Sequence, residues 1–425
     1  MAERTGGWLA WFSSAAISFP GPVAALPVAR RPLVRRPEGT AEVTMRVGVR
    51  RWRPAVIGLA VLASLMVGCS TTAPPAPSSS PVASAAETPH PPTGVDYAAL
   101  QQNLQSRLAA APDTQKAVRS IVLTVDGATK ISIYRDRKPT DHAHVWSVTK
   151  SVLSILVGIA VEEGRLRLDQ SLAELLPEHV AVMTSQQQTI TLEQLLTMTA
   201  GMPGDDGGLS LESDDPTGQL LAYGLSNDPG ATFLYSNSSA QLVATVLHRA
   251  IDRPILDYAR EKLFDPLGIV TRPAWEESDE KQGGGFDQAG FAWMRDSAGT
   301  HTGAFGLRLT TPDLTRLGQL YLDDGQWNGQ QLVPADWVAR STSPQLTPEQ
   351  AVEGQYGYLW WIIDNPGTGV RGYGAAGSWY QRIMVIPSRR VVLVVTAEDV
   401  DVPEDGVGPV LEPLLFDEVL APLAR

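Results

Sequence analysis

Two runs of apolar and β-branched residues flank a turn signal ahead of the middle of the chain. The runs are Ser120–Val125 and Lys130–Tyr134, and Asp126-Gly127 lies between them. β-Branched residues fit the pleated surface of a sheet, and Asp-Gly adopts the positive φ angles of a tight hairpin turn at low cost. The pattern therefore predicts a β-hairpin over residues 120–134.

The middle of the chain, residues 147–341, reads as mostly helical. An apolar run from Ser147 to Glu163 is a helix candidate that ends at Gly164. Two further helix starts are indicated by Thr191, with Gln194 as its partner in a capping box, and by Thr311-Pro312, an N-cap followed by proline in the first turn.

The end of the chain returns to strands. Apolar or aromatic runs predict them at Tyr356–Ile363, Gln381–Ile386 and Val391–Thr396, and an amphipathic stretch, Val410–Leu423, predicts a last helix. Strands at both ends with helices between them indicate an α+β fold for residues 96–425. In this fold one antiparallel sheet is built from the N- and C-terminal strands, is flanked by helices and carries a mostly helical inserted subdomain.

The composition fits a folded, acidic protein. Of the 425 residues, 43% are hydrophobic and 19% are charged, which excludes a chain that is disordered throughout. The net charge is -12 and no basic cluster lies in the body of the chain, so we expect no nucleic acid partner. Cys69 is the one cysteine, which excludes an intramolecular disulfide framework and a thiol-rich metal site.

Residues 45–69 have the layout of a lipoprotein-type signal peptide. Arginines at positions 46, 50, 51 and 53 precede the apolar run Ala55–Val67, which is shorter than the roughly 20 residues of a membrane span. The segment Leu65–Cys69 resembles a bacterial lipobox, in which the cysteine after the cleavage point takes a lipid. We therefore expect an exported protein anchored through Cys69 on the extracytoplasmic face of the cell membrane. The other interpretation is an ordinary cysteine inside a membrane anchor.

Two stretches flank this signal. Residues 70–95 are rich in Ser, Pro and Ala and are predicted to be a linker between the anchor and the domain. Residues 1–44 show no helical or strand period and precede Met45, which opens a well-formed signal. We therefore expect translation to start at Met45, and residues 1–44 to be a non-native or unstructured extension.

The motif Ser147-Val148-Thr149-Lys150 opens the first helix candidate. Residues three apart on a helix share a face, so the Ser147 hydroxyl and the Lys150 amine can meet. Serine becomes a good nucleophile when a neighbour accepts its proton, and a lysine desolvated among apolar residues can do so. The alternative is a capping serine with an unrelated lysine downstream, since S-x-x-K alone is common.

A second motif, Tyr235-Ser236-Asn237, lies just ahead of the helix-like run Gln241–Ile251. A phenol beside an ammonium group can relay protons between a nucleophile and a leaving group. The Asn237 amide can orient a substrate and hold Lys150. The alternative is a turn followed by a helix cap, which is the commoner meaning of Y-x-N in isolation.

The third motif, Ala375-Ala376-Gly377-Ser378, precedes the predicted strand Gln381–Ile386. A small residue and a glycine on an edge strand let a substrate acyl group lie along the backbone. The N–H of Ser378 can then join that of Ser147 as an oxyanion hole. The alternative is a glycine-rich bend between two strands.

In this order the three motifs resemble those of the serine β-lactamase and penicillin-binding-protein superfamily. The closer resemblance is to its class C-like esterase branch, which includes family-VIII esterases and 6-aminohexanoate-dimer hydrolases. The resemblance covers roughly residues 115–420 and includes the stretches Trp146–Ser151, Leu192–Met202, Gly306–Leu314 and Tyr356–Trp361.

The resemblance implies a β-lactamase-like fold and a serine hydrolase that works through an acyl-enzyme. It assigns the nucleophile to Ser147, a shared base role to Lys150 and Tyr235, and substrate binding or positioning to Asn237, Ala375, Gly377 and Ser378. The implied substrates are small esters, amides or peptides. Nothing in the sequence requires a cofactor or a metal, and nothing in it indicates an oligomeric state.

One departure from the superfamily pattern concerns the third motif. Where its β-lactamases and peptidases carry Lys-Thr-Gly, this chain has Ala375-Ala376-Gly377, and so lacks a cation for a substrate carboxylate. We therefore expect an ester or amide without that carboxylate. The competing hypotheses are a β-lactamase or D-Ala-D-Ala carboxypeptidase, and a non-catalytic lipoprotein that binds peptidoglycan peptides.

Aromatic residues crowd the same region. Tyr373, Trp379, Tyr380 and Trp360 are candidates for an apolar wall of the site, and their alternative role is to pack the sheet. Two other patterns are weaker. Asp141 with His142 and His144 could begin a metal site, but the remaining histidines show no ligand spacing. Residues 372–377 match G-x-G-x-x-G, yet a strand-like run follows where a dinucleotide motif requires a helix.

Overall fold

The computed structural model describes residues 89–110, 117–204, 209, 211–276, 285–398 and 408–423, which belong to one compact unit. The predicted extension (1–44), the signal segment (45–69) with Cys69 and most of the linker (70–95) lie outside the described residues. Those predictions stay predictions. In the described ranges, no helix is both long and apolar enough to cross a membrane.

The main sheet has six strands in the order β2-β1-β11-β10-β9-β8, and all neighbouring pairs are antiparallel. The strands are β1 (Val118–Val125), β2 (Ala128–Tyr134), β8 (Trp361–Asn365), β9 (Val370–Gly377), β10 (Gln381–Ile386) and β11 (Val391–Ala397). β1 pairs with β11, with Leu123 opposite Leu393, so the N-terminal hairpin joins strands from the end of the chain. The predicted hairpin and the predicted antiparallel sheet are both confirmed.

Two small sheets accompany the main one. They contain β3 (His142–His144), β5 (Leu307–Thr310) and β4 (Ala292–Trp293) in one case, and β6 (Gln326–Trp327) with β7 (Gln330–Gln331) in the other. β3 ends three residues before Ser147, so the first small sheet leads directly into the first motif.

Helices make up most of the rest. The α-helices are α1 (Tyr97–Ala110), α3 (Val148–Glu162), α4 (Leu172–Leu175), α5 (Ser185–Thr189), α6 (Leu192–Leu196), α7 (Pro216–Ala222), α8 (Asn237–Ile251), α9 (Ile255–Ala259), α10 (Asp265–Leu267), α12 (Thr311–Leu322), α13 (Ala335–Ser341), α14 (Gly408–Pro413) and α15 (Ala421–Leu423). Short 3-10 or π segments are η1 (Pro177–Val182), η2 (Arg260–Phe264), η3 (Phe286–Gln288), η4 (Ala351–Glu353), η5 (Ser378–Tyr380), η6 (Pro387–Arg389) and η8 (Leu414–Leu420).

At the central strands β10 and β11 both faces of the main sheet are buried, which explains the unbroken apolar runs Ile383–Ile386 and Val391–Val395. In β10, Ile383 and Val385 belong to the core shared with α3, α8 and α12. Met384 and Ile386, between and after them, belong to a second core with α1 and the C-terminal helical segment. Side chains alternate across a strand, so a strand covered on both faces is apolar at every position.

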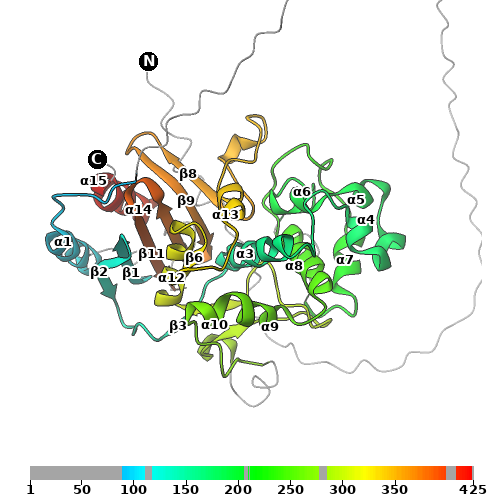
Figure 1. Ribbon diagram of the computed structural model, residues 1–425, viewed down its shortest axis with the longest axis horizontal. Helices are drawn as coiled ribbons and strands as arrows, with labels where there is room; N and C mark the ends of the chain where they lie inside the picture. The colour runs from blue at the N-terminus through cyan, green and yellow to red at the C-terminus, as the bar shows by residue number, and fades with distance from the viewer. Residues whose placement is uncertain are drawn as a thin grey trace, which may run out of the picture. The chain divides into compact units, whose positions relative to one another are not determined.

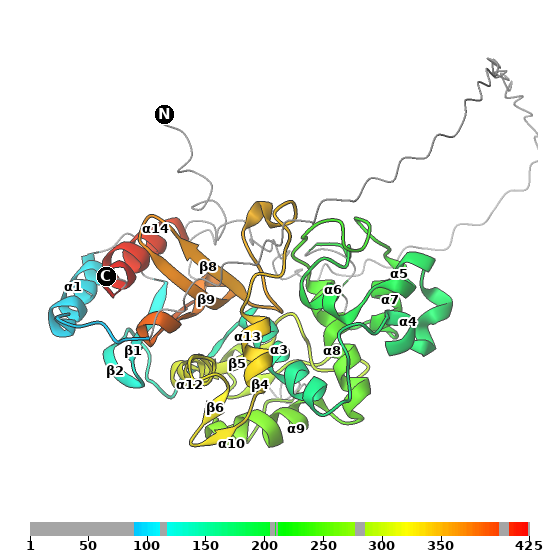
Figure 2. The same cartoon turned by 45° about the horizontal axis from the view of Figure 1, so that its top comes forward.

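The arrangement in space follows from these two cores. Figure 1 shows α1, α14 and α15 on one side of the sheet, and α3 and α12 on the other. Helices α4 to α8 gather beyond α3, away from the sheet, and Figure 2 shows the same separation in a second view. The predicted mostly helical insert between N- and C-terminal strands is therefore confirmed, and with it the α+β class.

Several local predictions were wrong in detail. The cap of α12 is Thr310 and not Thr311, because the Thr310 hydroxyl accepts from Asp313 N at 3.2 Å while the Asp313 carboxylate accepts from Thr310 N at 3.1 Å. The run Tyr356–Ile363 is only partly a strand. A turn closed by the bond from Gly357 N to Trp360 O interrupts it, and β8 begins at Trp361.

Other local predictions were confirmed or incomplete. Thr191 and Gln194 form the expected capping box of α6. The helix α3 ends as expected ahead of Gly164, whose φ is 70°. Sequence reasoning did not single out α1, although its buried Leu104 and Leu108 have helical spacing.

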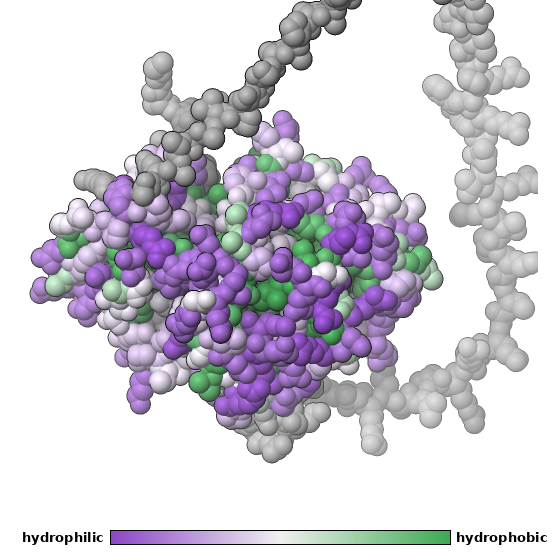
Figure 3. Space-filling model, viewed as in Figure 1, coloured by the Kyte–Doolittle hydropathy of each residue, from purple (hydrophilic) through white to green (hydrophobic). Residues whose placement is uncertain are grey.

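The outer surface on one side is mainly hydrophilic. Figure 3 shows hydrophobic residues in small groups among hydrophilic ones, with the more noticeable groups near the middle of that face. Scattered apolar surface of this kind is normal for folded proteins. It gives no broad apolar face on the side shown.

Candidate active site

Ser147 lies in the short connection between β3 and α3. It is 7% exposed, and Trp146 before it has a positive φ of 50°. Ser147 stands at the cap position of α3, but its side chain makes no capping hydrogen bond. Its hydroxyl instead accepts from Lys150 Nζ at 3.0 Å. The simple capping role considered from the sequence is therefore not what this side chain does.

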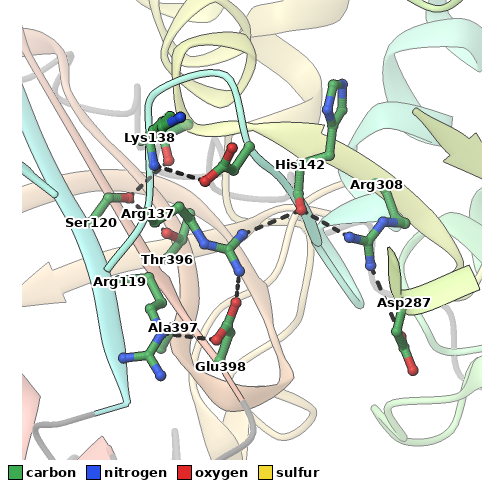
Figure 4. Close-up of polar contacts among 12 residues, drawn as sticks. Arg119, Ser120, Arg137, Lys138, His142, Asp287, Arg308, Thr396, Ala397 and Glu398 are labelled. Atoms are coloured by element: carbon green, nitrogen blue, oxygen red, sulfur yellow. Dashed lines mark hydrogen bonds and ion pairs between the residues drawn. The ribbon is translucent and has the colours of Figure 1, made fainter. Parts of the chain in front are cut away.

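Arginines anchor the strand that leads to Ser147. Arg137 and Arg308 both donate to the carbonyl oxygen of His142, at 3.3 and 2.9 Å (Figure 4). Arg137 also pairs with Glu398, which directly follows β11. The network ties the first residue of β3 to the main sheet and to β5. The chain segment that leads to Ser147 is therefore held in place by both sheets.

Lys150 lies at the centre of the site and is 1% exposed. Besides the Ser147 hydroxyl, its amine donates to Asn237 Oδ1 at 2.7 Å and to the carbonyl oxygen of Ala304 at 2.8 Å. These three oxygens come from the cap position of α3, from the start of α8 and from the loop ahead of β5. The predicted proximity of Ser147, Lys150 and Asn237 is what the structure shows.

This set of partners suits a group that exchanges a proton. A neutral lysine amine has two N–H donors and one lone pair, which match Asn237 and Ala304 as acceptors and the Ser147 O–H as donor. A protonated lysine has three N–H donors, which match all three oxygens. A proton can therefore pass between Ser147 and Lys150 without leaving a buried oxygen unpartnered.

Tyr235 reaches the same place from the segment ahead of α8. Lys150 Nζ lies 4.9 Å from the centre of the Tyr235 ring. The ring stacks on Trp361 at 5.6 Å and meets Tyr356 edge-on at 6.4 Å. Ser236, between Tyr235 and Asn237, caps α8 by accepting from Ser239 N at 3.0 Å. The motif thus supplies both a helix cap and two side chains of the site.

The end of β9 runs against the backbone of the first motif. A Cβ on Gly377 would lie 2.4 Å from the carbonyl oxygen of Val145 and 3.1 Å from Ser147 N. Side chains cannot fit there, so this close approach requires glycine. Ser378 is the next residue, and it begins η5. The third motif is thereby brought to the first, as the sequence predicted.

The expectation of an edge strand needs a correction. β9 lies between β10 and β8 in the sheet. Its pairing with β8, however, stops where Gly374 meets Trp361, while β9 continues to Gly377. In the described part of the chain, the Ala375–Gly377 segment therefore extends past β8 and is an edge only locally. The Ala375 side chain is 1% exposed and belongs to the core with α3.

Three of the four aromatic candidates pack the protein interior. Tyr373 donates its hydroxyl to the Tyr321 carbonyl at 2.9 Å, and Trp360 stacks on the Tyr321 ring at 4.3 Å. Tyr380 is 4% exposed. As walls of the site these three were wrong, because their rings are enclosed by the cores. Trp379 is half-buried.

Aromatic residues that sequence reasoning did not select lie at the site. Trp361 stacks on Tyr235, and Trp146 precedes Ser147; both are half-buried. The His144 ring stacks on Trp146 at 4.1 Å and meets Phe286 edge-on. Trp146 was visible as a neighbour of Ser147, whereas Trp361 joins the site only through β8.

The carbonyl of Ala304 is the other member that sequence reasoning missed. Its loop is fixed on α8: Gly303 N donates to Gln241 Oε1 at 2.9 Å, and a Cβ on Gly303 would lie 2.2 Å from the Ala240 carbonyl oxygen. Backbone carbonyls carry no residue-specific signal. Only the tight packing of Gly303 could have marked this segment.

His144, one of the two histidines that the sequence offers as metal ligands, has another role. His144 Nε2 accepts from Gly306 N at 3.1 Å. Burial, together with the charge of Arg308, lowers the pKa of His144 to about 3, which keeps the ring neutral. Across the described ranges, no group of three or more His, Cys, Asp or Glu side chains could hold a metal ion.

An antiparallel sheet, a helical insert and a serine–lysine pair on the first turn of a buried helix together define the β-lactamase-fold serine hydrolases. The Beta-lactamase family model matches residues 100–409, and the chain belongs to this family. The predicted superfamily is thereby confirmed. The roles of the individual site residues stay predictions.

Known proteins with similar sequences or structures agree with this assignment. Penicillin-binding protein 4 of Amycolatopsis lactamdurans is 25% identical over 303 residues, which are 65% of this chain and 76% of the relative. A penicillin-binding protein homologue from Caulobacter crescentus has a TM-score of 0.59 at 17% identity, covering 78% of this chain and 99% of its own. A D-stereospecific amidohydrolase from Streptomyces sp. has a TM-score of 0.52 at 20% identity, covering 71% and 94%. The two structural likenesses show a shared fold.

Proposed function

We propose that this protein is an exported, lipid-anchored serine hydrolase that cleaves an ester or amide bond through an acyl-enzyme on Ser147. The observation that carries the hydrolase part of the proposal is the 3.0 Å contact between Ser147 Oγ and Lys150 Nζ, with Asn237 and Ala304 as the other partners of the amine. The signal-peptide layout of residues 45–69 supports export and anchoring. If position 150 served only to pack the core, an apolar residue would be more stabilising than a buried lysine. The lysine and the non-capping serine beside it therefore point to a chemical role.

The proposed reaction has two halves. Ser147 Oγ bonds to the carbonyl carbon and its proton passes to Lys150, with Tyr235 sharing the base role. The carbonyl oxygen becomes an oxyanion that accepts from the N–H groups of Ser147 and Ser378. The bond to the alcohol or amine then breaks as that group takes the proton. Water attacks the acyl carbon, returns a proton to Ser147 through the same base, and releases the carboxylic acid.

The substrate class follows from the third motif. Ala375 presents a buried methyl group where superfamily members that bind carboxylates have a lysine. The half-buried rings of Trp146, Tyr235 and Trp361 offer aromatic surface beside the nucleophile. Both features favour uncharged esters or amides with apolar groups over β-lactams and D-Ala-D-Ala peptides.

Covalent labelling tests the nucleophile. The full chain is incubated with a fluorophosphonate probe and analysed by intact mass and peptide mapping. The expected result is one adduct, on Ser147, that is absent from Ser147→Ala. A matched control is Ser151→Ala, because Ser151 lies on the same helix but donates to the Leu359 carbonyl at 2.7 Å. No adduct on folded protein would favour the non-catalytic peptide-binding lipoprotein instead.

The anchor is tested separately. Expression of the full chain in a bacterial host with a radiolabelled fatty acid should give a labelled protein in the membrane fraction. The Cys69→Ser variant should lose the label and remain unprocessed. A labelled Cys69→Ser variant, or an unlabelled wild type, would contradict lipid attachment at Cys69 and leave the hydrolase proposal untouched.

A further inference from the structure

The turn that follows β9 has an unusual backbone. Trp379 and Tyr380 both have positive φ angles, of 57° and 67°. Non-glycine residues adopt this left-handed conformation at an energetic cost, and two in succession persist only where their surroundings hold them. The turn connects Gly377, which touches the backbone of the nucleophile segment, to β10. Contacts with neighbouring residues must therefore stabilise this turn.

Arg382 contacts this turn at three points. The side chain is 5% exposed, and its Nη1 donates to the carbonyl oxygens of Gly377 and Gln381, at 2.9 and 3.0 Å. The guanidinium carbon lies 4.2 Å from the centre of the Tyr380 ring. One buried cation thus contacts the start, the end and the strained middle of the turn. Arginine suits this task because its planar group donates at its edge and stacks on its face.

Arg382 lies on the face of the sheet that is opposite to the core with α3. In the register of β9 and β10, Arg382 is opposite Ala376, and Ile383 is opposite Ala375. Ile383 and Ala375 face the core with α3, so Arg382 and Ala376 face the other side, toward α14. The buried carboxyl of Glu412, in α14, interacts electrostatically with the guanidinium there. Arg382 therefore reaches Gly377 from the face of the sheet that is covered by α14.

The peptide group between Gly377 and Ser378 connects the two sides. Its carbonyl oxygen accepts from Arg382, and its N–H is that of Ser378, the second oxyanion donor of the proposed reaction. A trans peptide is planar, with C=O and N–H pointing in opposite directions. A cation on the carbonyl therefore fixes the direction of the N–H. It also polarises the peptide, which makes the N–H a stronger donor.

We propose that Arg382 is a positioning residue, which orients and polarises the Gly377–Ser378 peptide so that the Ser378 N–H stabilises the oxyanion. This inference rests on the proposed function. It assigns the strained turn a role, because the left-handed residues return the chain so that Arg382 can reach back to Gly377. It also gives the buried guanidinium a part in the reaction.

The test uses the full chain and p-nitrophenyl butyrate. Arg382→Met should lower kcat by about 100-fold with KM within about twofold of wild type. This is the result expected when a variant loses an interaction that is made only in the transition state. Arg382→Lys keeps one cationic donor and should retain an intermediate kcat. The matched control is Arg371→Met, because Arg371 lies on β9 with its side chain 79% exposed and pairs with Asp364 at the surface. Its kinetics should be those of wild type.

A second variant separates this role from general support of the fold. Ser378→Pro removes the N–H, and Gly377 at φ -134° and ψ 158° already has the extended conformation that precedes proline. If Arg382 acts through this peptide, Arg382→Met should cost little further kcat in the Ser378→Pro background. Affinity for a phenylboronic acid, which mimics the tetrahedral adduct, should fall in parallel with kcat in each variant.

The outcomes are distinguishable. An inactive, unlabelled wild type contradicts the proposed function itself. An active wild type with Arg382→Met at full kcat overturns the role of Arg382. The role is also overturned if the fold-losses in kcat of Arg382→Met and Ser378→Pro multiply in the double variant. It is overturned as well if Arg382→Met raises KM without lowering kcat. If Arg382→Met fails to fold, the comparison rests on Arg382→Lys, for which wild-type kcat and boronate affinity would be equally decisive.

Discussion

Gly377 lies against the backbone nitrogen of Ser147, at a distance that leaves no room for a side chain. A Cβ there would be 3.1 Å from Ser147 N and 2.4 Å from the Val145 carbonyl oxygen. The two residues are 230 positions apart in the chain, and the contact joins the end of β9 to the start of α3. The proposed oxyanion hole depends on this contact.

Gly377→Ala should therefore lower ester hydrolysis by at least about 100-fold, because backbone atoms on both segments must move apart. Fluorophosphonate labelling of Ser147 should slow to a similar degree. The control is Gly290→Ala, where an added Cβ meets nothing within 4 Å. Wild-type rates in Gly377→Ala would show that β9 is not part of the site.

Asn237 is expected to control the protonation of Lys150. Asn237→Asp puts a carboxylate within hydrogen-bond distance of the amine, where Asn237 Oδ1 now lies at 2.7 Å. The negative charge favours the ammonium form, so the acidic limb of the pH–rate profile should move to higher pH. Asn237→Leu removes the acceptor and should lower kcat by about 100-fold without that movement. Asn328→Asp, in an exposed turn, is the control and should leave the profile unchanged.

Ala375 is expected to determine the preference between esters and carboxylate-bearing substrates. Ala375→Lys should raise the rate of acylation by benzylpenicillin relative to p-nitrophenyl butyrate, because it restores a cation beside the nucleophile. Thermal stability should fall as well, since Ala375 is 1% exposed. Ala375→Met adds similar length without charge and should not change the ratio. An unchanged ratio in Ala375→Lys would remove this position from carboxylate recognition.

Glu412 is expected to make the protein less stable as the pH rises. Burial raises its pKa to about 7, against the opposing charge of Arg382. The folded protein therefore binds a proton that the unfolded chain loses near its ordinary pKa of about 4.3, and the resulting stabilisation disappears as the pH rises from that value to about 7. The difference is on the order of 3 kcal/mol. Glu412→Gln should therefore raise the free energy of unfolding at pH 8 but not at pH 4.

Urea unfolding at the two pH values measures this effect. Glu418→Gln is a suitable control, because Glu418 belongs to the same helical segment but pairs with Arg107 at 2.8 Å near the surface. Its effect should be small at both pH values. Equal effects of Glu412→Gln at pH 4 and pH 8 would contradict the raised pKa.

Local signals were sufficient for much of the fold. The Asp126-Gly127 turn and the capping box at Thr191 were correct because the physics of a turn or a cap involves residues within four positions of one another. The cap of α12 was misassigned by one residue because Thr310 and Thr311 are both good caps. Only the fit of Asp313 to Thr310 distinguishes them.

The site was predictable to the extent that side-chain motifs define it. Ser147 and Lys150 meet because both lie on one helix turn, which sequence spacing already requires. The aromatic wall was not predictable in the same way. Tyr373 and Tyr380 stand beside the third motif in sequence, yet the alternation of a strand and the strained turn direct their rings into the cores.

The sequence by itself determined the family, the placement of a mostly helical middle between N- and C-terminal strands, and the pairing of serine with lysine, because these depend on residue types and on short spacings. The tertiary structure alone decided that the Ala304 carbonyl completes the partners of Lys150 and that Trp361 stacks on Tyr235. It also decided that Arg382 donates a hydrogen bond to the Gly377 carbonyl. Backbone groups are the same at almost every position. Contacts between distant segments exist only after the cores have formed, so no local pattern records them.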